Sequence, residues 1–305
     1  MSPVIAITGP TASGKSALAE LVALEVGSPV ISADAMQVYR GMDIGTAKTP
    51  VGERRVPLLL VDVVGPAEPY SAALYQRDAR EEIDRELSSG IQPILCGGTG
   101  LYIQAALDEF SFPRGELASS AREAYEKIAR DQGADAVHRL LEQRDPASAA
   151  IIHPNNVRRA IRALEMHDQG VSYAEQAAGF SHTHEHYPHK TFALTMGRER
   201  LYKRIDERVD MMLGQGLVEE VEGLMEAGAA DALTSRQAIG YKEVIDALEG
   251  RCTMDEAIGL VKRRTRRYAK RQLSWCRRDK RIEWLDMDAL STSDALARIM
   301  GGIGR

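Results

Sequence analysis

The sequence of 305 residues contains little cysteine and no long hydrophobic run. Its three cysteines, Cys96, Cys252 and Cys276, lie far apart and form no Cys-x-x-Cys pair, which argues against a disulfide framework and a thiolate zinc site. No stretch reaches the roughly eighteen apolar residues that a membrane span needs, and the N-terminus does not resemble a secretion signal. We therefore expect a cytoplasmic protein that is neither secreted nor membrane-bound.

Basic residues are in a slight minority, but they are unevenly distributed. Lys and Arg number 39 against 44 Asp and Glu, a net charge of −5. Between Lys262 and Arg281, however, eleven basic residues stand against a single acid, Asp279. A strongly basic segment in an otherwise acidic chain indicates a surface that binds a polyanion.

The first motif of the chain is a phosphate-binding loop. Residues 9–16, GPTASGKS, fit the pattern Gly, four residues, Gly-Lys-Ser, between an apolar β-branched run at 4–8 and a helix-period run at 17–26. In this setting backbone N–H groups converge on phosphate, Lys15 adds a positive charge and the Ser16 hydroxyl reaches Mg²⁺. The predicted phosphate ligands are Gly9, Thr11, Ala12, Ser13, Gly14, Lys15 and Ser16. Because many enzymes share this loop, it does not identify the phosphate compound.

Polar residues follow the next predicted strand, residues 30–32. Ligands of a parallel sheet bind beyond the carboxyl ends of its strands, so Asp34 and Gln37 are expected to face the same crevice as Lys15. A helix cap or turn is the alternative role for Asp34. The segment 40–50 that follows has no periodicity and is interpreted as a functional loop.

Two further strand ends carry candidate site residues. The buried-strand pattern at 58–63 includes Asp62, which is a candidate for holding a magnesium-bound water or for a structural role. The strand predicted at 91–96 runs into Gly97-Gly98-Thr99-Gly100, a second glycine-rich turn that would bring N–H groups and the Thr99 hydroxyl to the phosphates. A tight turn without a ligand is the alternative.

The middle of the chain has a different character. Residues 113–188 show helical runs and no strand pattern, and strand-like alternation returns at 191–196. The predicted fold class is therefore α/β: a P-loop NTPase-like parallel sheet flanked by helices, formed by residues 1–112 and 189–305, with an inserted all-helical domain at 113–188. Four histidines within eight residues, from His182 to His189, are interpreted as part of a mobile polar loop in preference to a metal site.

The basic segment has the pattern of an amphipathic helix. One stripe at spacings of three and four is largely apolar: Ile258, Val261, Thr265, Tyr268, Gln272 and Trp275. The other face is basic and suits phosphates, with a merely solvated face as the alternative: Lys262, Arg263, Arg266, Arg267, Lys270 and Arg271.

Six ordered blocks give the chain a resemblance to a known family. GPTASGKS, ISADAMQVYRGMDIGTAK, GGTGLYI, HPNNVRRAIRALE, RQAIGYKE and RTRRYAKRQLSW together resemble the tRNA dimethylallyltransferases, also called tRNA isopentenyltransferases, over nearly the whole chain. The resemblance implies transfer of a dimethylallyl group from dimethylallyl diphosphate to the exocyclic amine of the adenosine just 3′ of the anticodon, with release of diphosphate. It also implies Mg²⁺ as the cofactor, bound at Ser16.

The resemblance further implies roles for individual residues. Asp34 would accept a proton from the attacking amine, Thr99 would bind the diphosphate near its bridging oxygen, and Gln37 would hold the adenine. Because the target base is stacked in an anticodon loop, it must be splayed out, which requires contacts outside the pocket. The implied tRNA-binding residues are Asp34, Ala35, Met36, Gln37, Thr99, Arg122, Arg158, Arg159, Arg162, Gln237, Gly240, Tyr241, Lys242, Arg266 and Arg267.

The chain departs from the family pattern at three places. Ala35 stands where the family usually has Ser, Asn156 where it often has Asp, and Leu58-Leu59-Leu60 where it commonly carries His. Contacts from those side chains are therefore not assumed. The zinc-finger extension common in eukaryotic members is not found, which favours a compact bacterial-type enzyme. We separately expect a monomer without an obligate protein partner.

Three other functions compete with this interpretation. An adenylate isopentenyltransferase would use the same cradle and base, but it needs neither a basic helix nor a helical insertion. A small-molecule kinase that binds ATP leaves the second glycine turn without a purpose. An RNA-binding protein without activity does not explain why Lys15, Asp34 and Thr99 converge.

Overall fold

The structure is a computed structural model that describes residues 2–110, 112, 120–179, 184–228 and 238–304. Contacts between Cα atoms divide the chain into two compact units, one formed by the residues up to Leu107 and from His186 onward, the other by Asp108–Glu185. Each unit is described separately below.

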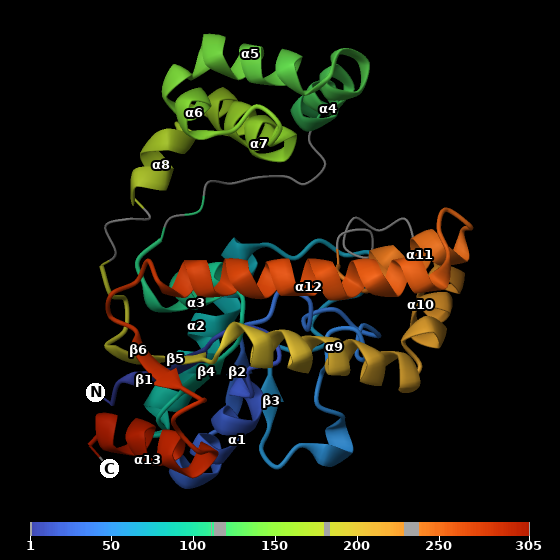
Figure 1. Cartoon of the computed structure of the whole chain (residues 1–305). Helices are drawn as coiled ribbons and strands as arrows, with labels where there is room; N and C mark the ends of the chain where they lie inside the picture. The colour runs from blue at the N-terminus through green and yellow to red at the C-terminus, as the bar shows by residue number, and fades with distance from the viewer. Residues whose placement is uncertain (1, 111, 113–119, 180–183, 229–237, 305) are drawn as a thin grey trace. The chain divides into compact units, whose positions relative to one another are not determined.

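A six-stranded parallel sheet forms the centre of the first unit (Figure 1), and it confirms the predicted α/β fold class. The strand order is β3-β2-β4-β1-β5-β6, so the strand that leads into the phosphate loop lies in the middle of the sheet. The strands are β1 (Val4–Thr8), β2 (Val30–Ser32), β3 (Leu58–Leu59), β4 (Ile94–Cys96), β5 (His189–Thr195) and β6 (Glu283–Asp286).

Helices cover both faces of this sheet because its strands are apolar on both sides. Successive side chains of a strand point to opposite faces. Ile5 and Ile7 accordingly pack in one core cluster with residues of α1 and α13, whereas Val4 and Ala6 belong to another cluster with residues of α2 and α3. These helices are α1 (Lys15–Val26), α2 (Ala72–Ser88), α3 (Gly100–Leu107) and α13 (Thr292–Gly302).

The third strand is shorter than predicted. Its ladder ends at Leu59, because Leu60 and Asp62 both adopt left-handed backbone conformations with φ of 57°. Such a conformation is rare for a side chain as bulky as leucine and cannot continue a strand. The segment 60–63 thus leaves the sheet, and a single-turn 3₁₀ helix, η1 (Val51–Glu53), precedes it.

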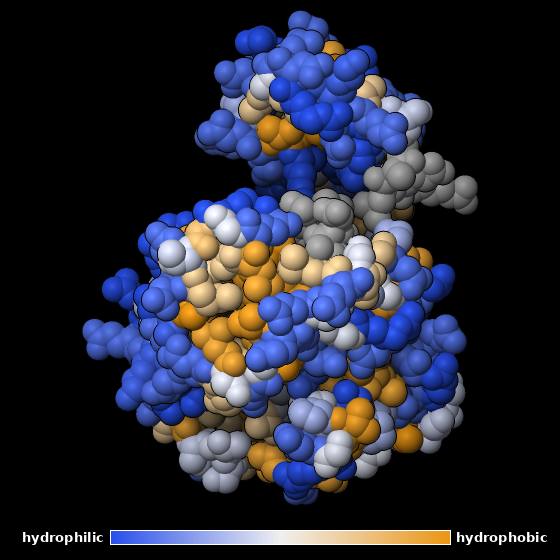
Figure 2. Space-filling view, turned by 90° about the vertical axis from the view of Figure 1, so that its right-hand side faces the viewer, coloured by the Kyte–Doolittle hydropathy of each residue, from blue (hydrophilic) through white to orange (hydrophobic). Residues whose placement is uncertain are grey.

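Two long helices lie side by side in the same unit, α9 (Arg198–Gly214) and α12 (Met254–Cys276) (Figure 1). Between them in the chain are α10 (Leu217–Glu226) and α11 (Tyr241–Leu248). Figure 2 shows that the face at the α10 and α11 end of this unit carries a broad hydrophobic area bordered by hydrophilic residues. Among the helices of the described residues, none combines the length and apolar character that crossing a membrane requires.

The second unit is entirely helical in the residues described. Its helices are α4 (Ser120–Gln132), α5 (Ala134–Arg144), α6 (Pro146–Ile151), α7 (Val157–Asp168) and α8 (Tyr173–Gly179). They enclose a core of their own that includes Val137, Leu141 and Leu164, each of which is fully buried. Asn156 caps α7, since its side-chain oxygen accepts a hydrogen bond from the Arg159 N–H at 3.4 Å.

Candidate active site

The phosphate loop joins β1 to α1 as the sequence predicts. Gly9 has a φ of 139°, and a Cβ there would lie 2.9 Å from the Leu194 carbonyl oxygen, so only glycine fits. Gly14 caps α1 in a left-handed conformation, and Lys15 is the first residue of the helix. Burial lowers the pKa of the Lys15 ammonium, which lies in the fields of Asp34 and Arg208.

Not every predicted phosphate donor of this loop is available to a ligand. The Thr11 N–H donates to Gln272 Oε1 at 2.9 Å, and the Ser13 N–H donates to the Pro10 carbonyl at 3.3 Å. The Thr11 N–H thus has a protein acceptor, while Thr11 also lines the smaller cavity, and its contact with phosphate stays a prediction. By contrast, Ser13 Oγ is buried and has no hydrogen-bond partner, which is the state expected of a group that binds a ligand.

Asp34 and Thr99 are brought together at the carboxyl ends of β2 and β4. The Met36 N–H donates to Asp34 Oδ1 at 2.9 Å, and the Ala35 N–H donates to Thr99 Oγ1 at 3.0 Å. The first bond is the local turn that the sequence analysis gives as the alternative role of Asp34. It also fixes the orientation of the carboxylate, so the turn and a site role are compatible.

The second glycine-rich turn owes its glycines to close packing. A Cβ at Gly97 would lie 2.1 Å from the Ala33 carbonyl oxygen, and one at Gly100 would lie 2.1 Å from Trp275. The N–H groups of Gly97 and Thr99 donate to carbonyls of Ile7 and Ala33. Those two N–H groups therefore have backbone acceptors here, and the contact of this turn with phosphate, including that of the Thr99 hydroxyl, stays a prediction.

Two cavities meet at this site. The smaller, of about 350 Å³, is lined by Asp34, Thr99 and Tyr268 together with apolar residues of α9 and α12. The larger, of about 970 Å³, is lined by Lys15 and Ser16 of the phosphate loop. Both volumes fall in the range of small-molecule sites. Arg208 and Met212 of α9 line both cavities.

Arg208 is a site residue that the sequence analysis missed. It lies on α9, where burial lowers its pKa while the charge of Asp34 acts in the opposite direction. A half-buried guanidinium between an acid and a phosphate loop provides a positive charge for an anion. Its spacing of four from Arg204 places both on one helical face, but many exposed basic pairs share that spacing.

Tyr268 of α12 is the second residue with a role that periodicity did not indicate. Burial, together with the nearby charge of Asp34, raises the pKa of its phenol to about 12, so it keeps its proton at neutral pH. It lines the smaller cavity with Asp34 and Thr99. Its hydroxyl is thus able to donate a hydrogen bond there.

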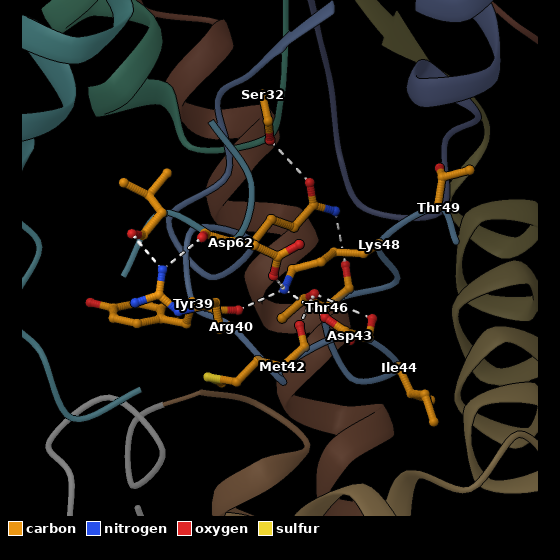
Figure 3. Close-up of polar contacts among 12 residues, drawn as sticks. Ser32, Tyr39, Arg40, Met42, Asp43, Ile44, Thr46, Lys48, Thr49 and Asp62 are labelled. Atoms are coloured by element: carbon orange, nitrogen blue, oxygen red, sulfur yellow. Dashed lines mark hydrogen bonds and ion pairs between the residues drawn. The ribbon is translucent and has the colours of Figure 1, made fainter. Parts of the chain in front are cut away.

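The non-periodic loop at 40–50 is held by a buried lysine (Figure 3). Lys48 Nζ donates to the Tyr39 carbonyl at 2.6 Å, to Asp43 Oδ1 at 2.6 Å and to Asp62 Oδ1 at 2.5 Å. Only 3% of the Lys48 side chain is exposed, and these three acceptors use all three of its hydrogens. Asp62 therefore has the structural role that was one of its two alternatives.

A glutamate holds the same loop from the opposite side. The N–H groups of Asp43, Ile44 and Gly45 all donate to the Glu220 carboxylate, at 2.9, 2.7 and 3.1 Å. The Tyr241 hydroxyl donates to the same carboxylate at 2.6 Å. Three consecutive N–H groups around one anion form a backbone nest, and here an internal side chain occupies it.

Two predicted tRNA-binding residues have internal partners. Gln37 Oε1 accepts a hydrogen bond from Ser32 at 3.0 Å and its Nε2 donates to the Thr46 carbonyl at 3.2 Å, so its amide joins β2 to the loop. Tyr241 is only 1% exposed and lines the smaller cavity. The tRNA contact of both residues stays a prediction.

The other predicted residues of that region remain predictions. Ala35, Met36 and Gly240 line the smaller cavity, and Lys242 is half-buried in α11. Gln237 lies outside the described residues.

The basic helix α12 divides its charges between two uses. Arg266 Nε donates to Asp206 Oδ1 of α9 at 3.0 Å, and Lys262 pairs with Asp210 at 2.6 Å. Arg266 thus has an acidic partner on α9, its side chain remains 33% exposed, and its contact with tRNA stays a prediction. A separate group of basic residues on the helix is exposed: Arg263, Arg267, Lys270 and Arg271.

Basic residues of the helical unit are similarly divided. Arg122 donates to the buried Glu165 at 3.0 Å, and Arg162 lies 3.8 Å from the same carboxylate. The Arg122 side chain is 19% exposed and pairs with an acid in the core of this unit, and its contact with tRNA stays a prediction. Arg158 and Arg159 are exposed at the start of α7.

The described residues offer no group of three His, Cys, Asp or Glu side chains that could hold a metal ion. Of the histidine cluster, His182 lies outside the described residues and His189 opens β5. Four acids line the larger cavity: Asp43, Glu53, Asp62 and Glu207. Two of them, Asp43 and Asp62, pair with Lys48.

Comparison with known proteins places these features in a wider group. A family model described as IPP transferase matches residues 37–279, and one described as isopentenyl transferase matches residues 2–54. The chain is 47% identical to a tRNA dimethylallyltransferase of Geobacillus kaustophilus, over 93% of this chain and 90% of that protein. It is 46% identical to one of Geobacter sulfurreducens, over 95% and 94%.

Solved structures show the same similarity. A tRNA isopentenylpyrophosphate transferase of Bacillus halodurans aligns with a TM-score of 0.72 and 39% identity, covering 99% of this chain and 96% of that one. A eukaryotic dimethylallyltransferase acting on tRNA aligns with a TM-score of 0.78 and 28% identity, covering 98% and 78%.

Proposed function

The chain belongs to the IPP transferase family, the tRNA dimethylallyltransferases, and from this premise we propose the reaction that its cavities carry out. It transfers a dimethylallyl group from dimethylallyl diphosphate to the exocyclic N6 amine of the adenosine 3′-adjacent to the anticodon in tRNA, and it releases diphosphate. One observation carries the proposal: the cavity that contains Asp34 and Thr99 adjoins the cavity of the phosphate loop at Arg208.

The two cavities suit the two halves of this reaction. The diphosphate lies against Lys15, Ser16 and the unpartnered hydroxyl of Ser13, while the adenine enters the smaller cavity beside Asp34. The amine nitrogen forms a bond to the first prenyl carbon as the bond from that carbon to the diphosphate oxygen breaks. Asp34, held by the Met36 N–H, accepts the proton that the amine loses.

Positive groups then stabilise the leaving diphosphate. Lys15 and Arg208 line the cavity in which its charge develops, and the Thr99 hydroxyl donates near the bridging oxygen. Because both cations are desolvated, their attraction for an anion is stronger than it would be in water. Orientation of the amine matters as much as the basicity of Asp34, since an exocyclic amine is a weak nucleophile.

We propose Mg²⁺ as the cofactor, held by the Ser16 hydroxyl and by diphosphate oxygens. A hydroxyl at the start of α1 and substrate oxygens match the ligands that Mg²⁺ prefers, and this ion usually keeps several waters. When bound, it supplies charge neutralisation to the diphosphate.

Exposed basic residues are proposed to hold the anticodon stem-loop. They are Arg267 on α12 and Arg158 and Arg159 on α7, which present charge at the surface of their units. We propose that the protein acts as a monomer, and that it acts in the cytoplasm on its tRNA substrate.

A labelling experiment tests the proposed reaction. The protein is incubated with labelled dimethylallyl diphosphate, Mg²⁺ and either an anticodon stem-loop or free AMP. We expect label in the stem-loop alone, at the adenosine after the anticodon. Label only in AMP would indicate an adenylate isopentenyltransferase, and label in neither acceptor would contradict prenyl transfer altogether.

A further inference from the structure

We propose that Gln272 is a positioning residue for the prenyl diphosphate: its amide ties the phosphate loop to the Thr99 turn and fixes the spacing of the two sets of diphosphate ligands. The inference rests on the proposed function, because it assigns both turns to the same diphosphate. The sequence pattern places Gln272 in the apolar stripe of its helix and does not indicate a positioning role.

The amide of Gln272 contacts both turns through buried hydrogen bonds. Its Oε1 accepts from the Thr11 N–H at 2.9 Å, and its Nε2 donates to the Gly98 carbonyl at 3.0 Å. Gln272 is only 6% exposed. The two bonds use opposite ends of one planar group, so one side chain from α12 joins the two turns, in addition to the bonds between Gly97 and residues of β1.

Close packing prevents α12 from shifting along these turns. A Cβ on Gly98 would lie 2.1 Å from Gln272 Nε2, and one on Gly100 would lie 2.1 Å from the Trp275 ring. Glycine at these positions therefore allows the helix to approach the backbone directly. Two residues of α12, three apart and on the same face, thus rest on the Thr99 turn.

The neighbouring helix holds the next residue of the phosphate loop. Arg204 of α9 donates from Nε to the Ala12 carbonyl at 2.7 Å. Ala12 has a left-handed φ of 63°, which costs conformational energy and needs support from its surroundings. The ion pair between Arg266 and Asp206 joins α12 to α9. Two joined helices therefore hold Thr11 and Ala12, which are adjacent in the phosphate loop.

The hydrogen bonds to Thr11 and Ala12 should affect the affinity for the donor. Side chains of α12 and α9 hold the backbone of Thr11 and Ala12. A loop that the protein itself holds in place loses less conformational freedom when the diphosphate binds, which favours affinity. Loss of the Gln272 amide should remove the link between the phosphate loop and the Thr99 turn. We expect this loss to weaken binding of the prenyl diphosphate and to leave binding of tRNA unchanged.

Two substitutions distinguish positioning from packing. Gln272→Met keeps the length of the side chain but removes both hydrogen bonds, and we expect the KM for dimethylallyl diphosphate to rise about tenfold or more at every pH. Gln272→Glu offers an oxygen to the Thr11 N–H, and when protonated it also donates to the Gly98 carbonyl. Its donor KM should therefore approach the wild-type value at low pH and rise as the carboxyl ionises.

The measurements include binding as well as turnover. Donor KM and kcat, the Kd of inorganic diphosphate with Mg²⁺, and the Kd of the anticodon stem-loop are determined across pH for both variants and the wild type. Ser274→Ala is the matched control on α12, because that exposed hydroxyl donates only to the Lys270 carbonyl of its own helix. The stem-loop Kd and the circular dichroism of all four proteins should agree.

The outcomes separate the inference from the function on which it rests. A wild type that binds no diphosphate and transfers no prenyl group overturns the proposed function. If the wild type is active and Gln272→Met has an unchanged donor KM and diphosphate Kd, the positioning role is wrong. Equal behaviour of the Met and Glu variants at low pH also overturns it, since packing alone would then explain both.

Discussion

Asp34 is held by one of its two carboxylate oxygens. Oδ1 accepts the Met36 N–H at 2.9 Å, so the carboxylate cannot rotate freely and Oδ2 has a fixed direction. The Ala35 N–H between these residues holds Thr99 in turn. Three consecutive residues after β2 therefore determine where the base and the Thr99 hydroxyl lie relative to each other.

The proton-accepting role of Asp34 is tested by Asp34→Asn. The amide oxygen can still accept the Met36 N–H, so the turn should survive while the basicity is lost. We expect kcat to fall by about a hundredfold or more, with little change in diphosphate Kd or stem-loop Kd. Single-turnover kinetics measure the effect, and Asp255→Asn, at an exposed acid in the first turn of α12, is the control. An unaltered rate would remove Asp34 from the mechanism.

Three sides of α12 make different contacts. One side rests on the glycine turns through Gln272 and Trp275. A second pairs Lys262 and Arg266 with acids of α9. The third carries the exposed basic residues, among them Arg267. A basic run in a sequence thus overstates the charge that a helix offers to a polyanion.

Arg266 and Arg267 are neighbours that should behave differently on substitution. Arg267→Gln should weaken stem-loop binding and reduce the slope of log K against log salt by about one, because it removes one phosphate contact. Arg266→Gln should leave the slope unchanged and lower the melting temperature, since it leaves Asp206 without its partner. Titrations of each variant with the anticodon stem-loop at several salt concentrations measure the two slopes. Identical slopes for both variants would mean that the exposed side of α12 is only solvated.

Local patterns predicted the regular elements well where one pattern determined the structure. β1 and β2 were recognisable as short apolar runs, and α12 as a helix with an apolar stripe, because burial imposes those periods. The end of β3 was not predictable, because the residue types at 60 and 62 do not indicate the left-handed backbone conformation that Leu60 and Asp62 adopt.

Site residues were predictable where a motif defines them, as in the phosphate loop. They were not predictable where partners distant in sequence decide the role. Gln37 and Tyr241 are occupied by Thr46 and Glu220, and Arg208 acquires its role only because α9 crosses both cavities. Such pairings depend on the packing of whole elements and have no local signature.

At the scale of the whole molecule, both cavities belong to the unit built on the sheet, and the helical unit has a core of its own. A ligand in the phosphate loop therefore acts on the folding equilibrium of the sheet-containing unit. It also provides Ser13 Oγ, buried and without a partner, with a hydrogen-bond acceptor.

Diphosphate with Mg²⁺ should raise the melting temperature of the protein. A ligand at a hundred times its Kd stabilises the folded state by about 2.7 kcal/mol, and the shift should grow with the logarithm of ligand concentration. Chelation of the metal with EDTA should reduce it. Lys15→Met is the control that should show little response. A shift unaffected by EDTA would contradict the proposed role of Mg²⁺ at Ser16.

Two backbone concavities among the described residues suit an anion. The one at residues 9–16 borders the cavity that we propose for the diphosphate. The one at Asp43 to Gly45 is filled by Glu220 of the same chain. Asp43 and Ile44 line the larger cavity and Gly45 lines the smaller one. An anion that belongs to the chain therefore fixes a segment that borders both cavities, and this contact does not depend on the concentration of any ligand.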